Sequence, residues 1–426
     1  MAVSSRQRSL WRFSRHETLF ALIVAAVTVW IATIVLVFGT QPLLGGDFVA
    51  FYTSGRFALR GDWAAQYDWP RLYALQSSLA PESSGYYYPQ VYQPLAPALY
   101  APFALVPFHA AFVAWLVFST LVYSSLIALA ANAWQRIPRT HTILAALVFP
   151  PFVAHQVLGQ STIWPMIGFV GGWWALTRGR PLTAGLILSL VAIKPHLGIA
   201  LAIVLIASRS WRVIAGLALG CAAQAVSSLV VCGAAVVRTY LQTMLFVVRN
   251  PQLFEATDPR HLHALRTSLE HILPAGLAEI GWLLAVVLIA WMTIKAWQRT
   301  DDWTLRFATL LLATLLISPH VQTYDAILLA PATLWLTKWA SENRRLSVIV
   351  GLAVLSIIFL TPTTRVAGVP LTIPLMLWIL WESCRGQGMR SRGFGTPATA
   401  SVTSHPVRRM PAADSRGLSN AGTNDE

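Results

Sequence analysis

The sequence has little charge: 11% of its 426 residues are Asp, Glu, Lys or Arg, whereas 56% are hydrophobic. A soluble chain carries about 25% charged residues, so an ordinary globular domain is excluded. The strand-length alternation that marks an outer-membrane barrel is also missing. Apolar stretches recur from Ala21 to Trp381. Because the backbone must satisfy its own hydrogen bonds in lipid, these stretches should be helices.

Cysteine is scarce, and acidic residues are few. Cys221, Cys232 and Cys384 have no metal-like spacing and imply no disulfide framework. His261 and His263 stand two positions apart, and such residues do not share a helix face, so we expect no metal and no cofactor. The net charge is +14, but the basic residues are dispersed between apolar segments. We read them as topology signals and expect no nucleic-acid partner.

Apolar segments that are present predict an all-α fold, a polytopic transmembrane bundle of about 12 spans. The basic start resembles a signal sequence, but the first apolar run is long enough to span and lacks a clear cleavage site, so we read it as retained. The expected helices lie near 19–39, 108–133, 141–157, 161–177, 181–193, 196–208, 213–233, 275–295, 304–319, 325–340, 346–361 and 368–383.

Short basic loops then set the topology. Arginine and lysine concentrate on one side of this arrangement, which the positive-inside rule makes the cytoplasm. We therefore expect a multi-pass protein of the plasma (bacterial inner) membrane with both termini cytoplasmic. Residues 1–18 form a cytoplasmic arm, residues 19–383 the transmembrane domain, and residues 384–426 a disordered cytoplasmic tail rich in Ser, Gly, Pro and Arg.

Two long external loops are expected, at about 40–107 and 234–274. The first carries two amphipathic patterns that predict helices lying in the membrane interface. Their apolar faces are Phe48, Phe51, Tyr52 and Leu59, opposite Arg56 and Arg60, and then Leu72, Leu75 and Leu79. The proline-rich stretch from Tyr86 to Pro107 indicates a broken path rather than a full span.

Polar residues near membrane depth are costly, so they are the functional candidates. They form four clusters: Asp47; Gln160; Lys194 with His196; and His320 with Tyr324 and Asp325. The topology puts all four on the non-cytoplasmic side, and one shared site is the economical explanation. Ordinary roles stay open: Asp47 as a helix cap, Lys194 reaching headgroups, the histidines satisfied at helix ends, and Asp325 capping a helix or pairing with Lys194.

At these residues the chain resembles glycosyltransferase family 87, the polyprenol-phosphate-mannose-dependent mannosyltransferases of the GT-C class. The resemblance runs from about Gly45 to Trp381. It rests on Gly46-Asp47-Phe48 with Tyr52, Tyr88-Pro89 with Pro94, Gly159-Gln160, Ile193-Lys194-Pro195, and Ser318-Pro319-His320 with Tyr324-Asp325. Gln90 and Thr162 depart from the family pattern, which often has Pro and Asn there.

The resemblance implies a GT-C fold, a lipid-linked donor and an Asp of the first external loop in the reaction. The expected activity is transfer of a hexose, mannose by family default, from a polyprenyl-phosphate donor to a lipid or glycan acceptor. The reaction needs a base for the acceptor hydroxyl and cations for the phosphate. We assign catalysis to Asp47 and His320, donor-phosphate binding to Lys194, His196 and Arg56, and substrate binding to Gln160, Tyr88, Gln93, Tyr324 and Asp325.

One carboxylate suffices for a displacement with inversion, whereas a retaining route needs a second one nearby, so inversion is expected. The alternatives are a lipid-linked glycan flippase or small-molecule transporter, and a structural membrane protein. A transporter often carries inverted repeats and charges in mid-span, and neither is evident here. A structural protein would leave the one-sided polar clusters unexplained.

Overall fold

The computed structural model describes residues 46–80, 88–250, 262–361, 363–366 and 368–385. These all belong to one compact unit, Met1–Gly388, and a second unit, Met389–Glu426, lies outside the described residues. The N-terminal arm, the first expected span at 19–39 and the tail beyond Arg385 also lie outside them. The described chain is almost entirely helical, which confirms the all-α prediction.

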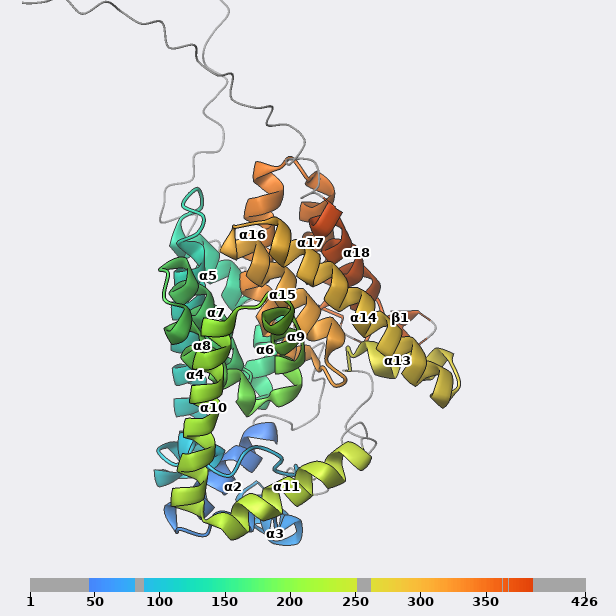
Figure 1. Ribbon diagram of the computed structural model, residues 1–426. Helices are drawn as coiled ribbons and strands as arrows, with labels where there is room; N and C mark the ends of the chain where they lie inside the picture. The colour runs from blue at the N-terminus through green and yellow to red at the C-terminus, as the bar shows by residue number, and fades with distance from the viewer. Residues whose placement is uncertain (1–45, 81–87, 251–261, 362, 367, 386–426) are drawn as a thin grey trace, which may run out of the picture. The chain divides into compact units, whose positions relative to one another are not determined.

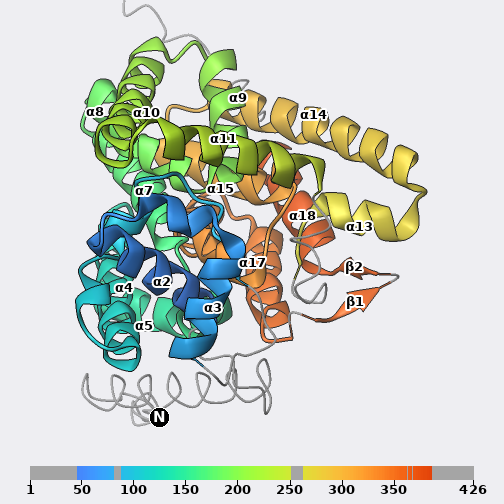
Figure 2. The same cartoon turned by 90° about the horizontal axis from the view of Figure 1, so that it is seen from below.

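The first loop folds into short helices, of which α2 and α3 are shown in blue in Figures 1 and 2. They are α2 (Gly46–Leu59), η2 (Trp63–Tyr67), α3 (Trp69–Leu79), η4 (Ala96–Leu99) and η5 (Phe103–Leu105). Phe48, Phe51 and Tyr52 are buried within the protein, whereas Leu59 is 45% exposed.

A bundle of longer helices follows. It contains α4 (Phe108–Ala131), α5 (Arg139–Leu147), α6 (Pro150–Leu158) and α7 (Ile163–Thr177). The single helix expected at 141–157 is instead the pair α5 and α6, bent by 58°. Pro150 and Pro151 explain the break, because proline lacks an N–H and restricts the residue before it.

The middle of the chain packs tightly. It contains α8 (Pro181–Leu188), η6 (Ser189–Ile193), η7 (Pro195–Gly198), α9 (Ile199–Ala207), α10 (Trp211–Cys232) and α11 (Ala234–Arg249). Helices α8 and α10 lie side by side in Figure 1. A Cβ atom on Gly185 would lie 2.0 Å from the Val213 carbonyl oxygen, so only glycine permits this backbone approach.

The last part contains α13 (Leu265–Ile272), α14 (Ala275–Arg299), α15 (Trp303–Ile317), η9 (Thr323–Leu328), α16 (Leu329–Glu342), α17 (Leu346–Ile358) and α18 (Thr372–Arg385). A hairpin of β1 (Arg365–Val366) and β2 (Val369–Pro370) precedes α18. The helix expected from 368 therefore begins at Thr372. Gly368, with φ of +83°, lies in the turn of the hairpin, at a position that the sequence predicted to be helical.

Three described helices are long and apolar enough to cross a membrane: α4, α10 and all but the first residue of α14. The bent pair α5 and α6 raises the number to four if it counts as one span. The other expected spans that fall on described residues are shorter helices or broken ones. The described residues therefore do not confirm a bundle of about 12 spans, although shorter helices occur at the predicted places.

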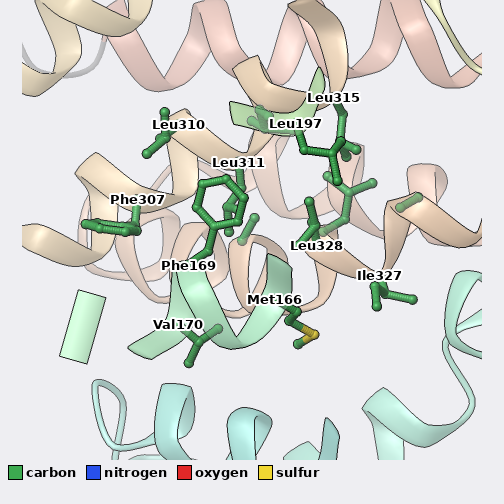
Figure 3. Close-up of a cluster of buried hydrophobic side chains, with 14 of the residues drawn as sticks. Met166, Phe169, Val170, Leu197, Phe307, Leu310, Leu311, Leu315, Ile327 and Leu328 are labelled. Atoms are coloured by element: carbon green, nitrogen blue, oxygen red, sulfur yellow. The ribbon is translucent and has the colours of Figure 1, made fainter. Parts of the chain in front are cut away.

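A buried apolar cluster supports the elements that carry the polar residues (Figure 3). Met166 comes from the first turns of α7, Leu197 from η7 and Leu328 from η9. Side chains of α15 such as Leu311 and Leu315 fill the space between them. Full burial of one such side chain contributes about 1.5–3 kcal/mol. The turns next to Thr162, Lys194 and Asp325 are thereby held by a common core.

Candidate functional site

Four segments that are far apart in sequence meet in one polar cluster. Asp47 lies in the first turn of α2, and Gln160 lies in the turn between α6 and α7. Lys194 separates η6 from η7, and Asp325 lies in the first turn of η9. The expectation that distant polar side chains gather in one place agrees with this arrangement.

The cluster contains a buried ion pair. Lys194 Nζ lies 2.8 Å from Asp325 Oδ1, and the two residues are 4% and 1% exposed. Lys194 also donates to Thr162 Oγ1 at 2.8 Å, and the Thr162 hydroxyl donates to Asp325 Oδ1 at 2.7 Å. The other carboxylate oxygen of Asp325 accepts from the backbone N–H of Gln322. Each charge is thus compensated inside the protein, as a buried pair requires.

Asp325 illustrates how strongly this pairing acts. Burial alone would raise the pKa of its carboxyl group. The positive charge of Lys194 and the hydrogen bonds from Lys194 and Thr162 outweigh burial, so the pKa of Asp325 is lowered. The helix that carries it, η9, is not among the candidate membrane spans. Asp325 is therefore an ionised partner of Lys194.

Gln160 connects the buried pair to Asp47. Its Oε1 accepts from Lys194 Nζ at 3.2 Å and from the Ser161 backbone N–H at 3.1 Å. Its Nε2 donates to Asp47 Oδ2 at 2.5 Å. The amide oxygen therefore faces the positively charged Lys194 ammonium, and the amide NH₂ group supports the Asp47 carboxylate.

Asp47 differs from Asp325 in exposure. It keeps intermediate solvent exposure, and the helix α2 that carries it is not a candidate span. Its surroundings raise the pKa of Asp47 to about 6, because burial opposes charge, while the Gln160 hydrogen bond and the Lys194 charge act to lower it. A carboxylate with this pKa is ionised at neutral pH and can accept a proton.

Two glycines let α2 approach this cluster. Gly159 ends α6 in the left-handed region at φ +67°, and a Cβ there would lie 2.5 Å from Phe48 Cβ. Gly46 faces the hydroxyl end of Tyr88, and a Cβ there would lie 2.8 Å from the Tyr88 hydroxyl oxygen. Both close contacts flank Asp47. Close packing therefore explains why a glycine precedes both Asp47 and Gln160 in the sequence.

The two candidate histidines lie beside each other near the ion pair. The His196 and His320 ring centroids are 6.3 Å apart, at an interplanar angle of 84°. Both rings interact electrostatically with Lys194 and Asp325. Burial lowers the pKa of His320, which lies in the loop after α15, so its ring is neutral near pH 7. The Nε2 atom of His196 is buried without a hydrogen-bond partner in the described part of the chain.

The other predicted residues divide into two groups. Tyr324 belongs to the cluster, since Lys194 Nζ lies 4.7 Å from its ring centroid, and Tyr88 lies above Gly46. Gln93 instead donates to Gln224 Oε1 on α10 at 2.7 Å. Arg56 is nine residues beyond Asp47 on α2, which places it about 13 Å along the helix and on the opposite side. Neither residue is brought to Asp47.

Three described residues of the cluster were not among the predicted site residues. Thr162 bridges Lys194 and Asp325, and Ser161 supports Gln160. Tyr92 forms a hydrogen bond of 2.9 Å with Ser161 through its hydroxyl. The signal for Thr162 was its position two residues after Gln160, in the same inter-helix turn. Tyr92 gave no signal beyond its place in the Tyr- and Pro-rich segment.

The arrangement offers a partly exposed carboxylate, two adjacent histidines and a compensated ion pair. Within the described ranges, no group of three His, Cys, Asp or Glu side chains is placed to hold a metal ion. Comparison with protein families matches residues 91–319, more than half of the chain, to glycosyltransferase family 87. No curated protein and no solved structure matches the chain.

Proposed function

The chain belongs to glycosyltransferase family 87, and on that premise we propose that it transfers a hexose, mannose by family default, from a polyprenyl-phosphate donor. The acceptor is a lipid or glycan hydroxyl, and transfer takes place on the non-cytoplasmic face of the plasma (bacterial inner) membrane. Several apolar helices support a membrane location. Family membership favours this enzyme over the flippase or transporter that the sequence alone left open.

Asp47 is the proposed base. The acceptor oxygen attacks the anomeric carbon of the sugar while its proton passes to the Asp47 carboxylate. The bond from the anomeric carbon to the phosphate oxygen breaks, and the polyprenyl phosphate leaves with the electron pair. The single observation that carries this role is the hydrogen bond from Gln160 to the partly exposed Asp47, which orients one carboxylate oxygen and keeps the group ionised.

The leaving phosphate is assigned to the histidine pair. His196 and His320 are partly exposed neighbours, and Nε2 of His196 has no hydrogen-bond partner within the described residues. Two neutral imidazoles can each donate one N–H to phosphate oxygens, and such donors stabilise charge that develops on the leaving group. Tyr88, whose hydroxyl lies next to Gly46, and Tyr324, whose ring centroid lies 4.7 Å from Lys194 Nζ, are proposed to contact the sugar.

The test uses purified full-length protein with a radiolabelled polyprenyl-phosphate hexose and membrane glycolipid acceptors. Asp47→Asn should lose transfer by at least a hundredfold, since general-base catalysis contributes about 10²–10⁴. Asp68→Asn is the matched control, because Asp68 caps α3 in the same external segment and Asn caps equally well. Wild-type turnover in Asp47→Asn would remove Asp47 from the reaction.

A further inference from the structure

Lys194 has no hydrogen left to give to a ligand in this arrangement. An ammonium group has three N–H donors. Those of Lys194 reach Asp325 Oδ1 at 2.8 Å, Thr162 Oγ1 at 2.8 Å and Gln160 Oε1 at 3.2 Å. The side chain is also 4% exposed. Direct binding of a donor phosphate would therefore require these bonds to break inside the protein, at the cost of uncovering Asp325.

The Gln160 amide is oriented by its oxygen. Two donors, Lys194 Nζ and the Ser161 N–H, converge on Oε1, which leaves Nε2 pointing to Asp47. The opposite orientation would place the amide NH₂ against the Lys194 ammonium and the amide oxygen against the Asp47 carboxylate. Both contacts are repulsive. The charge of Lys194 therefore decides which end of Gln160 meets Asp47.

We infer that Lys194 is a positioning residue: held by Asp325 and Thr162, it fixes the Gln160 amide so that Nε2 holds Oδ2 of Asp47 and the acceptor hydroxyl is left to Oδ1. This inference rests on the proposed function, because it concerns the same carboxylate. It replaces the phosphate-binding role expected for Lys194 from sequence. It also gives Thr162 a function, since its hydroxyl accepts from Lys194 and donates to Asp325.

The charge environment of Asp47 agrees with this role. Burial raises the pKa of Asp47, whereas Gln160 and Lys194 act to lower it and Asp325 acts to raise it. The titratable groups that interact with Asp47 come from the first loop, the η6–η7 turn and η9, and they are Tyr92, Lys194, Tyr324 and Asp325. The Tyr88 hydroxyl lies next to Gly46, and His155, His196 and His320 interact with the pair of Lys194 and Asp325. Lys194 is the one cation in this group, so its loss should make Asp47 harder to ionise.

The experiment measures kcat, the donor KM and the acid limb of kcat/KM against pH. Lys194→Met alone leaves Asp325 buried and unpaired, so the working variant is the neutral pair Lys194→Met with Asp325→Asn. We expect kcat to fall about 10²-fold, the scale of a misplaced catalytic group. We also expect the acid limb to move upward, because losing the Gln160 hydrogen bond and the Lys194 charge outweighs losing the Asp325 charge. The donor KM should be unchanged. Lys338→Met, at a pair with Glu342 on α16, is the control.

A second variant keeps the inference testable if the neutral pair folds poorly. Gln160→Leu removes the connection but keeps both Lys194 and Asp325, and it should lower kcat to the same extent. Combining it with the neutral pair should add little, because both act through one contact. A donor KM raised tenfold with an unmoved acid limb would instead show that Lys194 binds phosphate. Every variant keeps Asp47, so that outcome overturns this inference, whereas active Asp47→Asn overturns the proposed function.

Discussion

Nε2 of Gln160 donates a hydrogen bond of 2.5 Å to Oδ2 of Asp47, across 113 positions of sequence. The bond joins the turn after α6 to the first turn of α2, and it is the point at which the buried ion pair meets the partly exposed carboxylate. One oxygen of Asp47 is thereby occupied by a neutral donor, and the other is left to the acceptor. The geometry of α2 against α6 is therefore part of the proposed chemistry.

Gly159→Ala should disturb the hydrogen bond between Gln160 and Asp47. Its effect should be larger than that of left-handed backbone strain alone. The new Cβ would lie 2.5 Å from Phe48 Cβ, and Phe48 follows Asp47. Gly179→Ala is a close control, because Gly179 has φ of +69° against +67° for Gly159 and no atom within 4 Å of an added Cβ. The control should lose about 1–2 kcal/mol from left-handed strain.

Melting temperature and transfer rate distinguish the two glycine variants. Gly159→Ala should melt lower than Gly179→Ala and transfer more slowly. Equal melting temperatures and equal rates in the two would show that the contact between Gly159 and Phe48 does not position Asp47.

Thr162→Val should destabilise the protein by about 1–3 kcal/mol, because it leaves a buried N–H of Lys194 without its acceptor. Thr309→Val is the matched control: Thr309 is equally buried, but its hydroxyl bonds only to carbonyls of its own helix, α15. Chemical unfolding in detergent measures both. Thr162→Ser, which keeps the hydroxyl, should restore most of the loss, and a serine variant as unstable as the valine one would rule out the bridge.

Transfer should invert the anomeric configuration of the sugar. A retaining route needs two carboxylates about 5–5.5 Å apart, both able to reach the sugar. Asp325 is 1% exposed and held by Lys194 and Thr162, so Asp47 is the carboxylate left to react. Proton NMR of the product made from a donor of known anomeric form decides the question. A product with the donor's configuration, or a sugar covalently trapped on Asp47, would contradict this mechanism.

Much of the helical fold follows from hydropathy. The expected helices at 108–133, 161–177 and 213–233 correspond to α4, α7 and α10. Apolar runs bounded by basic or proline residues fix such helices locally, so their ends are visible in sequence. Whether each helix is long enough to cross the membrane does not follow from hydropathy alone. The bend at Pro150 and the short 3₁₀ segments η6 and η9 divide stretches that hydropathy alone reads as continuous.

The site was predictable in part. The cost of polar groups near lipid selected Asp47, Gln160, Lys194 and Asp325, and all four lie in one cluster. The partners of each group were not predictable, because they depend on how turns from different helices approach one another. The pairing of Lys194 with Asp325 was one of the ordinary readings left open. Its geometry is the reason that we propose a positioning role for Lys194 in place of the phosphate binding expected from sequence.

Arg56 and Gln93 show the limit of selecting residues by type. Both are polar residues of the first loop and resemble candidates in sequence. Arg56 lies on the opposite side of α2 from Asp47, because it is nine residues further along the helix. Gln93 is engaged by Gln224, a polar residue within the long apolar helix α10. The local sequence pattern did not show that a polar side chain within an apolar helix would form a hydrogen bond with a residue of the loop.

The role of Asp47 as base is tested most directly by the pH dependence of kcat/KM in the wild type and in Asp47→Asn. The base works when deprotonated, so wild-type kcat/KM should be level above the pKa of about 6 and fall tenfold per pH unit below it. The residual rate of Asp47→Asn should show no such limb. The same acid limb in both proteins would contradict the account.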